Sequence, residues 1–427
     1  MRDYLTILGA GLAGSEAAWQ AAERGVSVVL YEMRPVKPTP AHKTDHCAEL
    51  VCSNSLGNNQ SPSAPYLLKE ELRKFNSLVI DAGDTHAVPA GAALAVDREL
   101  FSKKITEQLL KHPNITLIRE EVTEIPSEGP VIVATGPLTS PRLSESISRL
   151  IGQEYLYFYD AISPIVDANT INYDKTFFAS RYDKGTDDYL NCPLNEGQYY
   201  SLVNELKNGE KVPFKSFEKP IYFEGCMPVE ELAMRGDKTL AFGPLKPVGL
   251  LHPETKEQFY AVVQLRHENK EGTAFNLVGF QTKLTYPEQK RVIRLIPGLE
   301  NAEFFRFGAI HRNTYINAPD VLSCELDLKK NSGIYFAGQI IGVEGYVESV
   351  SMGLLAALSA VKRIKGEVYS TPPVDTALGS LLKYVTETRR QSFQPMNINY
   401  GLFQVQEMKI RNKRERNKKI ELKALDS

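Results

Sequence analysis

The sequence of 427 residues lacks any apolar run close to the ~18–20 residues that a membrane-spanning helix needs. It also lacks an excess of charge of one sign, because 50 Lys and Arg residues face 52 Asp and Glu residues and leave a formal net charge of −2. This balance argues against a uniformly basic nucleic-acid-binding surface, although it does not exclude a local basic patch. The N-terminus shows no small-residue cleavage site after a sustained apolar stretch, so we expect no signal peptide and a cytoplasmic protein.

Cysteine is scarce and its pattern is not that of a disulfide-bonded protein. The five cysteines are odd in number and widely spread, and they form no C-x-x-C pair; they are Cys47, Cys52, Cys192, Cys226 and Cys324. Such a pattern indicates reduced thiols. For Cys192 and Cys324 we expect inert, buried side chains.

The order of predicted elements indicates an α/β fold with an inserted lobe. Hydrophobic residues make up 42% and charged residues 24% of the chain, as in ordinary folded proteins, and the length suggests about two to three lobes. Strands are predicted at 4–8 and 26–31, with a helix over 10–24 between them, which is typical of a parallel sheet covered by helices.

Other segments divide the chain. Residues 35–65 are rich in Pro, Ser and Asn and predict a long loop. Residues 158–304 are strand-like and aromatic, and α/β character returns after them. We therefore predict a discontinuous dinucleotide-binding domain formed by 1–157 and 305–427, with an inserted α+β domain at 158–304. The basic run at 409–419 predicts a solvated terminal helix rather than an RNA contact.

A dinucleotide-binding fingerprint follows the first predicted strand. It reads Gly9-Ala10-Gly11-Leu12-Ala13-Gly14 and opens the first helix. Its glycines permit a tight turn and close approach of a pyrophosphate to the helix N-terminus. Glu32 ends the second strand, where a carboxylate can accept a hydrogen bond from a ribose 2′-hydroxyl. Because Glu32 would repel a 2′-phosphate, this site favours FAD or NAD over NADP.

Two further segments select FAD. A buried strand at 131–133 leads into a turn with Thr135 and Gly136, and a strand at 333–336 leads to Gly338 and Gln339 before a helix of small residues. Both are similar to segments of two-dinucleotide-fold FAD proteins, in which distant parts of the chain return to one flavin. The sequence thus predicts a Rossmann-like FAD-binding domain, and the absence of a second fingerprint argues against a separate NAD(P)H domain.

Eight runs, in order, closely resemble the TrmFO family of bacterial folate- and FAD-dependent tRNA (uracil-5-)-methyltransferases, from the first strand to about Leu402. They lie at 32–35, 40–42, 48–57, 94–98, 189–193, 224–233, 242–250 and 311–315. The resemblance implies formation of 5-methyluridine at position 54 of the tRNA T-loop. It also implies 5,10-methylenetetrahydrofolate as carbon donor, FAD as the flavin, and NADH or NADPH as reductant. No obligatory protein partner is evident from the sequence.

The resemblance carries two cysteines onto this chain as catalytic residues. Uracil C5 is a poor nucleophile until a thiolate adds at C6, so the reaction needs a nucleophilic Cys, a base and a hydride donor. We assign Cys226 as the attacking thiolate and Cys52 as its partner in removing the C5 proton, with the reverse order left open. A helix predicted at 229–234 would help to lower the pKa of a thiol just before it.

Substrate contacts are less clear from the sequence. His311 and Arg312 could hold a folate carboxylate or an RNA phosphate, or form an ion pair between strands. Lys246 is similarly ambiguous, and the resemblance places all three near the flavin. The donors His42, His46, Cys47 and Cys52 match no zinc spacing, so no metal site is expected. No RNA-recognition module is evident, so RNA binding would depend on shape, phosphates and an extruded base.

Three rival functions share parts of this pattern. A flavin oxidoreductase acting on a small molecule would use the cysteines as a redox pair, but C-x-x-C is absent. An S-adenosylmethionine methyltransferase also opens with a glycine turn, but the segments at 131–136 and 333–338 disfavour it. A non-enzymatic nucleotide-binding tRNA chaperone offers no reason for Cys52 and Cys226.

Overall fold

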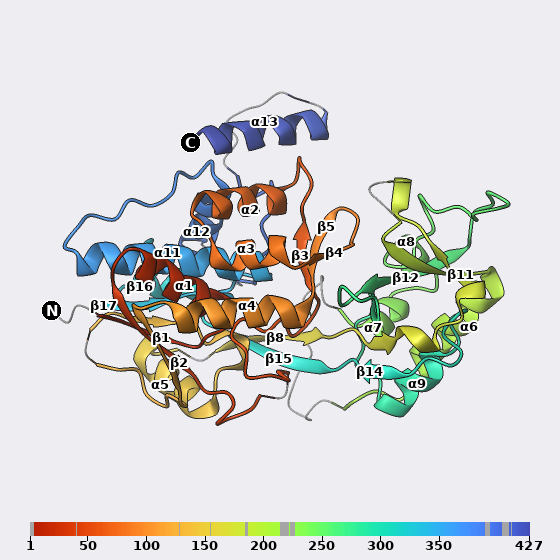
Figure 1. Ribbon diagram of the computed structural model, residues 1–427, viewed down its shortest axis with the longest axis horizontal. Coiled ribbons are helices and arrows are strands. Elements are labelled where there is room, and N and C mark those ends of the chain that lie inside the picture. Colours follow the sequence, from red (N-terminus) through yellow and green to blue (C-terminus); the bar gives the residue numbers. More distant parts are fainter. Residues whose placement is uncertain are drawn as a thin grey trace.

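The protein consists of two bodies joined by a pair of long strands (Figure 1). The computed structural model describes residues 4–39, 41–127, 129–153, 155–183, 187–213, 222, 227–388, 393–403, 410 and 412–427. The first body is built on a six-stranded sheet in the order β16-β17-β7-β1-β2-β6. Its strands are β1 (Tyr4–Leu8), β2 (Ser27–Glu32), β6 (Ile115–Arg119), β7 (Val131–Val133), β16 (Asp327–Leu328) and β17 (Asn331–Phe336).

Five of these strands run parallel, and only β16 pairs in the antiparallel direction. The side chains of β7 are fully buried, as expected for a central parallel strand covered on both faces. α1 (Leu12–Glu23) packs closely against α11 (Tyr346–Ile364). The contact depends on small residues, because a Cβ atom at Gly353 would lie 2.2 Å from the carbonyl oxygen of Ala13.

Further helices and a small antiparallel sheet complete the first body. The helices are α2 (Ala64–Lys74), α3 (Leu78–Thr85), α4 (Arg98–Lys111), α5 (Pro141–Ile151), α10 (Ala318–Val321), α12 (Ala377–Glu387) and α13 (Lys413–Asp426). The small sheet has the order β3-β5-β4, formed by β3 (Ser55–Asn58), β5 (Ala93–Val96) and β4 (Ala87–Val88). Among the described helices, none is long and apolar enough to cross a membrane.

The second body has an antiparallel sheet and a hydrophobic core of its own. The strand order is β10-β11-β12-β13-β9-β14, formed by β10 (Phe177–Phe178), β11 (Tyr189–Leu194), β12 (Ala261–His267), β13 (Ala274–Leu277), β9 (Ile165–Asp167) and β14 (Phe304–Arg306). Its helices are α6 (Glu196–Asn208), α7 (Val229–Met234), α8 (Thr239–Phe242) and α9 (Tyr286–Ile293). β8 (Leu156–Ala161) and β15 (Ile310–Tyr315) pair antiparallel along their whole lengths and connect the two bodies.

The predicted fold class, a Rossmann-like α/β domain with an inserted α+β lobe, is confirmed, with local differences. The first helix begins at Leu12 rather than at residue 10, because Gly9 has a φ of +96° and Gly11 is extended. The predicted loop at 35–65 contains β3 and the first residues of α2. The terminal helix α13 is not simply solvated, because Ile420 and Ala424 are buried.

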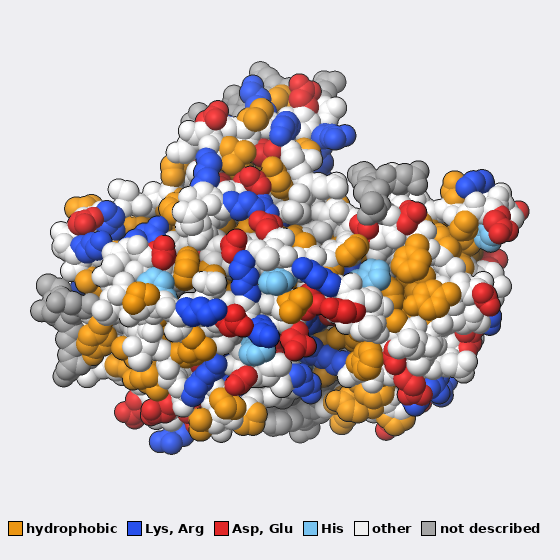
Figure 2. All heavy atoms as spheres, viewed as in Figure 1, with side chains coloured by type: hydrophobic (Ala, Val, Ile, Leu, Met, Phe, Trp, Pro, Cys, Tyr) orange, Lys and Arg blue, Asp and Glu red, His pale blue; other side chains and the backbone are white. Residues whose placement is uncertain are grey.

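The surface agrees with the near-neutral net charge. Lys, Arg, Asp and Glu side chains are interspersed over the face of the first body that Figure 2 shows. A denser group of apolar side chains lies on the second body in the same view. Among the residues coloured in Figure 2, the face in view is not uniformly basic.

Candidate cofactor groove and thiol site

A groove opens where the parallel strands end. β1, β2, β7 and β17 lead directly into the segments that line it, since the carboxyl ends of parallel strands share one edge of the sheet. Nine of the eleven residues predicted to bind the cofactor line this groove; they are Gly9, Gly11, Leu12, Ala13, Glu32, Thr135, Gly136, Gly338 and Gln339. The other two, Ala10 and Gly14, are not among the lining residues: the N–H of Ala10 donates to Glu32, and Gly14 packs against Gly9.

The glycine turn brings α1 very close to the strand end. A Cβ atom at Gly14 would lie 1.8 Å from the carbonyl oxygen of Gly9, so no larger residue fits without moving the helix. A Cβ atom at Gly11 would instead meet no atom within 4 Å, because it would stand in the groove. No side chain caps the first turn of α1. The turn therefore suits a pyrophosphate, which can approach the backbone at Gly11 and take hydrogen bonds at the helix N-terminus.

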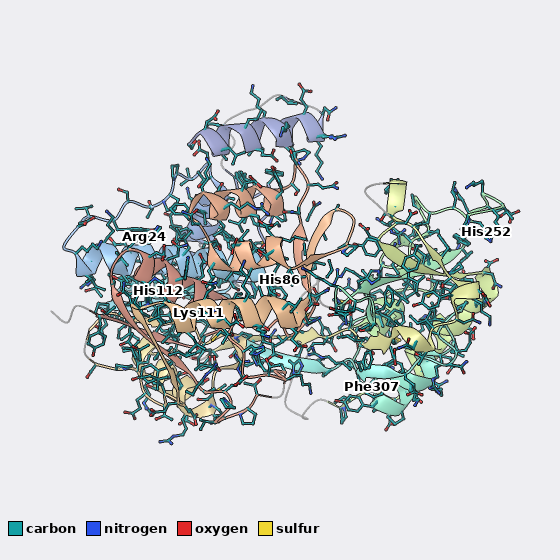
Figure 3. All side chains as sticks on the ribbon, viewed as in Figure 1. Arg24, His86, Lys111, His112, His252 and Phe307 are labelled. Atoms are coloured by element: carbon teal, nitrogen blue, oxygen red, sulfur yellow. The ribbon has the colours of Figure 1, made fainter. Side chains whose placement is uncertain are left out.

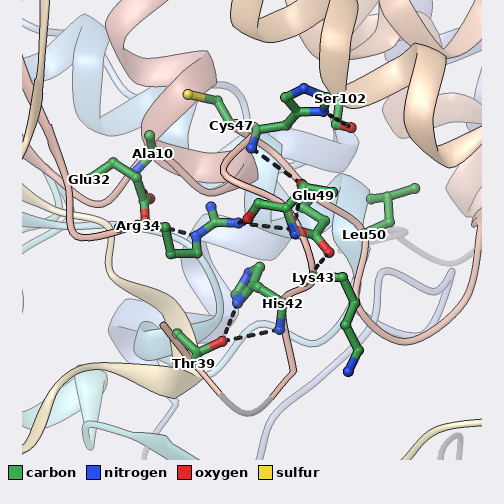
Figure 4. A network of polar contacts seen from close by, with 12 residues as sticks. Ala10, Glu32, Arg34, Thr39, His42, Lys43, Cys47, Glu49, Leu50 and Ser102 are labelled. Carbon is green, nitrogen blue, oxygen red and sulfur yellow. Dashed lines mark hydrogen bonds and ion pairs between the residues drawn. The ribbon is translucent and has the colours of Figure 1, made fainter. Parts of the chain in front are cut away.

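Glu32 takes part in a buried polar network at the same edge (Figure 4). Its Oε2 accepts from the N–H of Ala10 at 3.0 Å, and its Oε1 accepts from Arg34 Nε at 2.9 Å. Arg34 also donates from Nη1 to Glu49 Oε2 at 3.1 Å. Burial opposes ionisation of Glu32, but the hydrogen bonds and charge of Arg34 outweigh it and lower the pKa of this carboxyl. Glu32 therefore borders the groove as an ion-paired carboxylate.

His42 lines the groove from the other side of Arg34 (Figure 4). Its Nδ1 lies 2.6 Å from Thr39 Oγ1. Burial and the positive charge of Arg34 lower the pKa of His42 to about 4. The imidazole ring is therefore uncharged at neutral pH. It can donate or accept a hydrogen bond, but it cannot supply a positive charge.

Cys52 lies in the loop that leads into β3, beside the groove. Its N–H donates to the hydroxyl oxygen of Tyr346 at 2.8 Å, and its Sγ lies 3.8 Å from the carbonyl oxygen of Ala161. Tyr346 and Val51 both line the groove. The loop bearing Cys52 is therefore part of the wall of the same cavity that the glycine fingerprint borders.

Cys226 lies outside the described residues. Tyr222, four positions before Cys226, forms an isolated parallel bridge with Tyr159 of β8. Tyr159 lies two positions before Ala161, whose carbonyl oxygen is close to the Cys52 thiol. The helix predicted after Cys226 is present as α7, with the bounds Val229–Met234. It has only six residues, however, and its first turn carries Glu230 and Glu231, so its N-terminus is a poor source of positive potential.

The remaining cysteines differ in exposure. Cys192 is fully buried as predicted, and burial raises the pKa of its thiol. The expectation that Cys324 is buried is wrong, because this thiol is exposed in the turn before β16. Cys47 is fully buried, and burial raises the pKa of its thiol to about 11.

Metal ligands do not gather in the part of the chain that the structure describes. Within it, no group of three or more His, Cys, Asp or Glu side chains is placed to hold a metal ion. The histidines labelled in Figure 3 illustrate this dispersion: His86 and His112 end the helices α3 and α4, whereas His252 belongs to the second body.

The three residues expected to contact substrate lie in two parts of the fold. His311 is in β15 opposite Asp160, and burial together with Arg306 lowers the pKa of its imidazole to about 4. Arg312 occupies the next position of β15, but its side chain is not described. Lys246 is exposed on the second body and does not line the groove. Their roles stay predictions.

Comparison with known proteins identifies the family. The family model described as "Glucose inhibited division protein A" matches residues 4–368. A methylenetetrahydrofolate–tRNA-(uracil-5-)-methyltransferase TrmFO from Natranaerobius thermophilus is 58% identical over 98% of this chain and 96% of its own. The TrmFO of Bacillus subtilis is 54% identical over 99% of this chain and 97% of its own. The chain belongs to the TrmFO family.

Solved structures extend the likeness of this TrmFO-family chain at the level of fold. A crystal structure of Aquifex aeolicus GidA is 18% identical, with a TM-score of 0.70, and covers 92% of this chain and 70% of that chain. A second crystal form of the same protein gives a TM-score of 0.69. At this identity the likeness establishes the flavoprotein fold.

The sequence missed several groove residues of the TrmFO-family chain. Arg34, His42 and Tyr346 all line the groove, although the sequence predicts a role for none of them. The sequence does carry a signal for Arg34, because this residue lies two positions after Glu32, just beyond the end of the second strand. No local signal marks Tyr346, whose contact with Cys52 joins residues 294 positions apart.

Proposed function

We propose that this protein transfers the methylene carbon of 5,10-methylenetetrahydrofolate to C5 of uridine 54 in the tRNA T-loop and forms 5-methyluridine. The observation that carries the proposal is the continuity of the glycine-fingerprint groove with the Cys52 loop, through Val51 and Tyr346, in a TrmFO-family chain. The relatives' names do not favour the alternative of a small-molecule flavin oxidoreductase with a redox cysteine pair. We also propose that the enzyme acts in the cytoplasm without an obligatory protein partner.

The groove fits FAD. The first turn of α1 and Gly11 would hold the pyrophosphate, and Glu32 would face a ribose. Thr135, Gly136, Gly338 and Gln339 would border the rest of the cofactor. When bound, reduced FAD supplies the hydride that converts an exocyclic methylene into a methyl group. NADH or NADPH would reduce it, and we propose this without a separate domain for the nicotinamide.

In this proposal Cys226 is the nucleophile and Cys52 is the base. The Cys226 thiolate forms a C–S bond at uracil C6, and the electron pair moves to the C5–C4–O4 enolate. C5 then attacks the folate methylene carbon, and the bond between that carbon and folate N10 breaks. The Cys52 thiolate next accepts the C5 proton, and the electron pair of the C5–H bond expels folate N5, which leaves an exocyclic methylene on C5. Hydride addition to the exocyclic methylene regenerates the enolate, which expels Cys226 and restores the C5–C6 double bond.

The substrate contacts follow the same proposal. We assign His311 and Arg312 of β15, and Lys246 of the second body, to contacts with folate or the T-arm. Because the pKa of His311 is lowered to about 4, it would contribute a neutral hydrogen bond, whereas Arg312 and Lys246 would contribute charge. We keep the domain limits of 1–157 with 305–427 and 158–304 as part of this proposal.

Covalent trapping tests the cysteine roles. A T-arm RNA with 5-fluorouridine at position 54 cannot lose its C5 substituent as a proton, so the C6 adduct should persist on denaturing gels. We expect trapping by the wild-type protein and by Cys52→Ala, and none by Cys226→Ala. Trapping by Cys226→Ala but not by Cys52→Ala would reverse the two roles. No adduct with any protein, together with turnover of a small-molecule substrate, would favour the oxidoreductase instead.

A further inference from the structure

Arginine side chains hold three consecutive carbonyl groups of the Cys52 loop. Arg98 donates from Nη1 to the carbonyl oxygen of Leu50 at 2.6 Å and from Nη2 to that of Cys52 at 3.2 Å. Arg306 donates from Nη2 to the carbonyl oxygen of Val51 at 2.7 Å. The backbone on both sides of the thiol is thus fixed by charged donors, which make hydrogen bonds about twice as strong as neutral ones.

A carboxylate from the second body fixes the guanidinium of Arg98. Glu268, directly after β12, accepts from Arg98 Nε at 2.6 Å and from Nη2 at 3.2 Å. The side chains of Arg98 and Glu268 are 16% and 6% exposed. Burial opposes the charge on Arg98, but Glu268 outweighs it and raises the pKa of the guanidinium above its usual range. This bidentate, buried ion pair leaves Arg98 little freedom to move.

The backbone N–H groups of the Cys52 loop are held by a residue of the first body. The hydroxyl oxygen of Tyr346, on α11, accepts from the N–H groups of Cys52 and Ser53 at 2.8 and 3.2 Å. The loop therefore has its amides tied to the body that holds the groove, and its carbonyls tied to arginines. One of these arginines is locked by Glu268, and Arg306 itself belongs to β14 of the second body. The position of the Cys52 thiol thus depends on contacts that residues of the second body make.

We propose that Arg98, locked by Glu268, is a positioning residue that sets the place of the Cys52 thiol relative to the groove. This inference rests on the proposed function, in which Cys52 accepts the C5 proton. A displacement of about 1 Å at a reacting group can cost about 100-fold in rate. A lysine keeps the positive charge of Arg98 but lacks the planar fork that reaches Leu50, Cys52 and Glu268 together.

The test compares Arg98→Lys with Arg73→Lys in the FAD-loaded protein. Arg73 offers a matched control, because it makes the same two-bond pair with Asp84, at 2.8 and 2.7 Å, on the surface of the first body. For Arg98→Lys we expect the amides of Cys52 and Ser53 to exchange with deuterium about 10-fold faster. We also expect kcat for carbon transfer to fall about 10- to 100-fold, with the KM for tRNA and the FAD content within about 2-fold of wild type.

Arg73→Lys should leave all of these quantities unchanged. Glu268→Gln, which keeps the shape of the partner but removes its charge, should move both exchange and kcat in the same direction by a smaller factor. The proposal is overturned if exchange at Cys52 and Ser53 and kcat in Arg98→Lys match those in Arg73→Lys. A wild-type enzyme that transfers no folate carbon would refute the proposed function, while the exchange rates would still decide whether Arg98 holds the loop.

Discussion

Replacing Gly14 by alanine should separate the packing role of the glycine fingerprint from its binding role. The added Cβ atom would stand 1.8 Å from the carbonyl oxygen of Gly9, whereas real Cβ atoms keep at least 3.0 Å from such atoms. Helix α1 would have to move by more than 1 Å. Ala13 and Gly353 pack α1 tightly against α11, so α1 cannot move without disturbing that contact as well.

The cost is that of overpacking a dense core, about 1–3 kcal/mol or slightly more. We expect the melting temperature of the FAD-free protein to fall by about 2–5 °C, measured by differential scanning calorimetry. Gly197→Ala is a suitable control, because Gly197 is exposed in the first turn of α6 and its nearest neighbouring atom would be 3.6 Å away. There the substitution should be neutral or stabilise by up to about 1 kcal/mol.

Gly11→Ala should give the opposite pattern. Its Cβ atom meets nothing within 4 Å and extends into the groove, so the FAD-free protein should keep its melting temperature within about 1 °C. The bound FAD recovered with the protein should nevertheless fall by at least about 10-fold, because the methyl group occupies the place of a phosphate. Full FAD content in Gly11→Ala, or an unchanged melting temperature in Gly14→Ala, would refute this account of the fingerprint.

Two further outcomes follow from buried and exposed groups. Burial raises the pKa of Glu348 to about 7, so the folded state favours the protonated carboxyl. The stability that this group contributes is therefore complete below about pH 4 and is lost as the pH rises through 7. Relative to Glu348→Gln, the wild type should therefore lose about 2 kcal/mol of unfolding free energy between pH 5 and 8 in urea titrations, and an unchanged difference would contradict this. Iodoacetamide should alkylate the exposed Cys324 of the native protein at least about 100-fold faster than the buried Cys47; equal rates by peptide mass spectrometry would show that the burial assignments are wrong.

Features encoded within a short stretch of sequence could be predicted well. The fingerprint at 9–14, the acid at Glu32 and the strand ends at 135–136 and 338–339 are local patterns, and a parallel sheet brings them to one edge by its geometry. The sequence also predicts helix α7 with its observed bounds, because a proline precedes a short helix-like run.

Features that join distant residues could not be predicted. Arg98 and Glu268 are 170 positions apart and belong to different bodies, so no periodicity or spacing marks their pair. The exposure of Cys324 depends on a turn before an edge strand, not on the residue type. The buried face of α13 is not predicted, because its two buried apolar residues, Ile420 and Ala424, are outnumbered by charged neighbours.

The most direct test of the proposed function follows the carbon. Purified protein with FAD and NADPH or NADH is given unmodified tRNA and 5,10-methylenetetrahydrofolate labelled in its methylene carbon, and a parallel reaction contains methyl-labelled S-adenosylmethionine instead. We predict label in 5-methyluridine from the folate reaction alone, and none when uridine 54 is replaced by cytidine. Label from S-adenosylmethionine, or no folate-derived label from a protein that retains FAD, would contradict the proposed function and leave the fold unaffected.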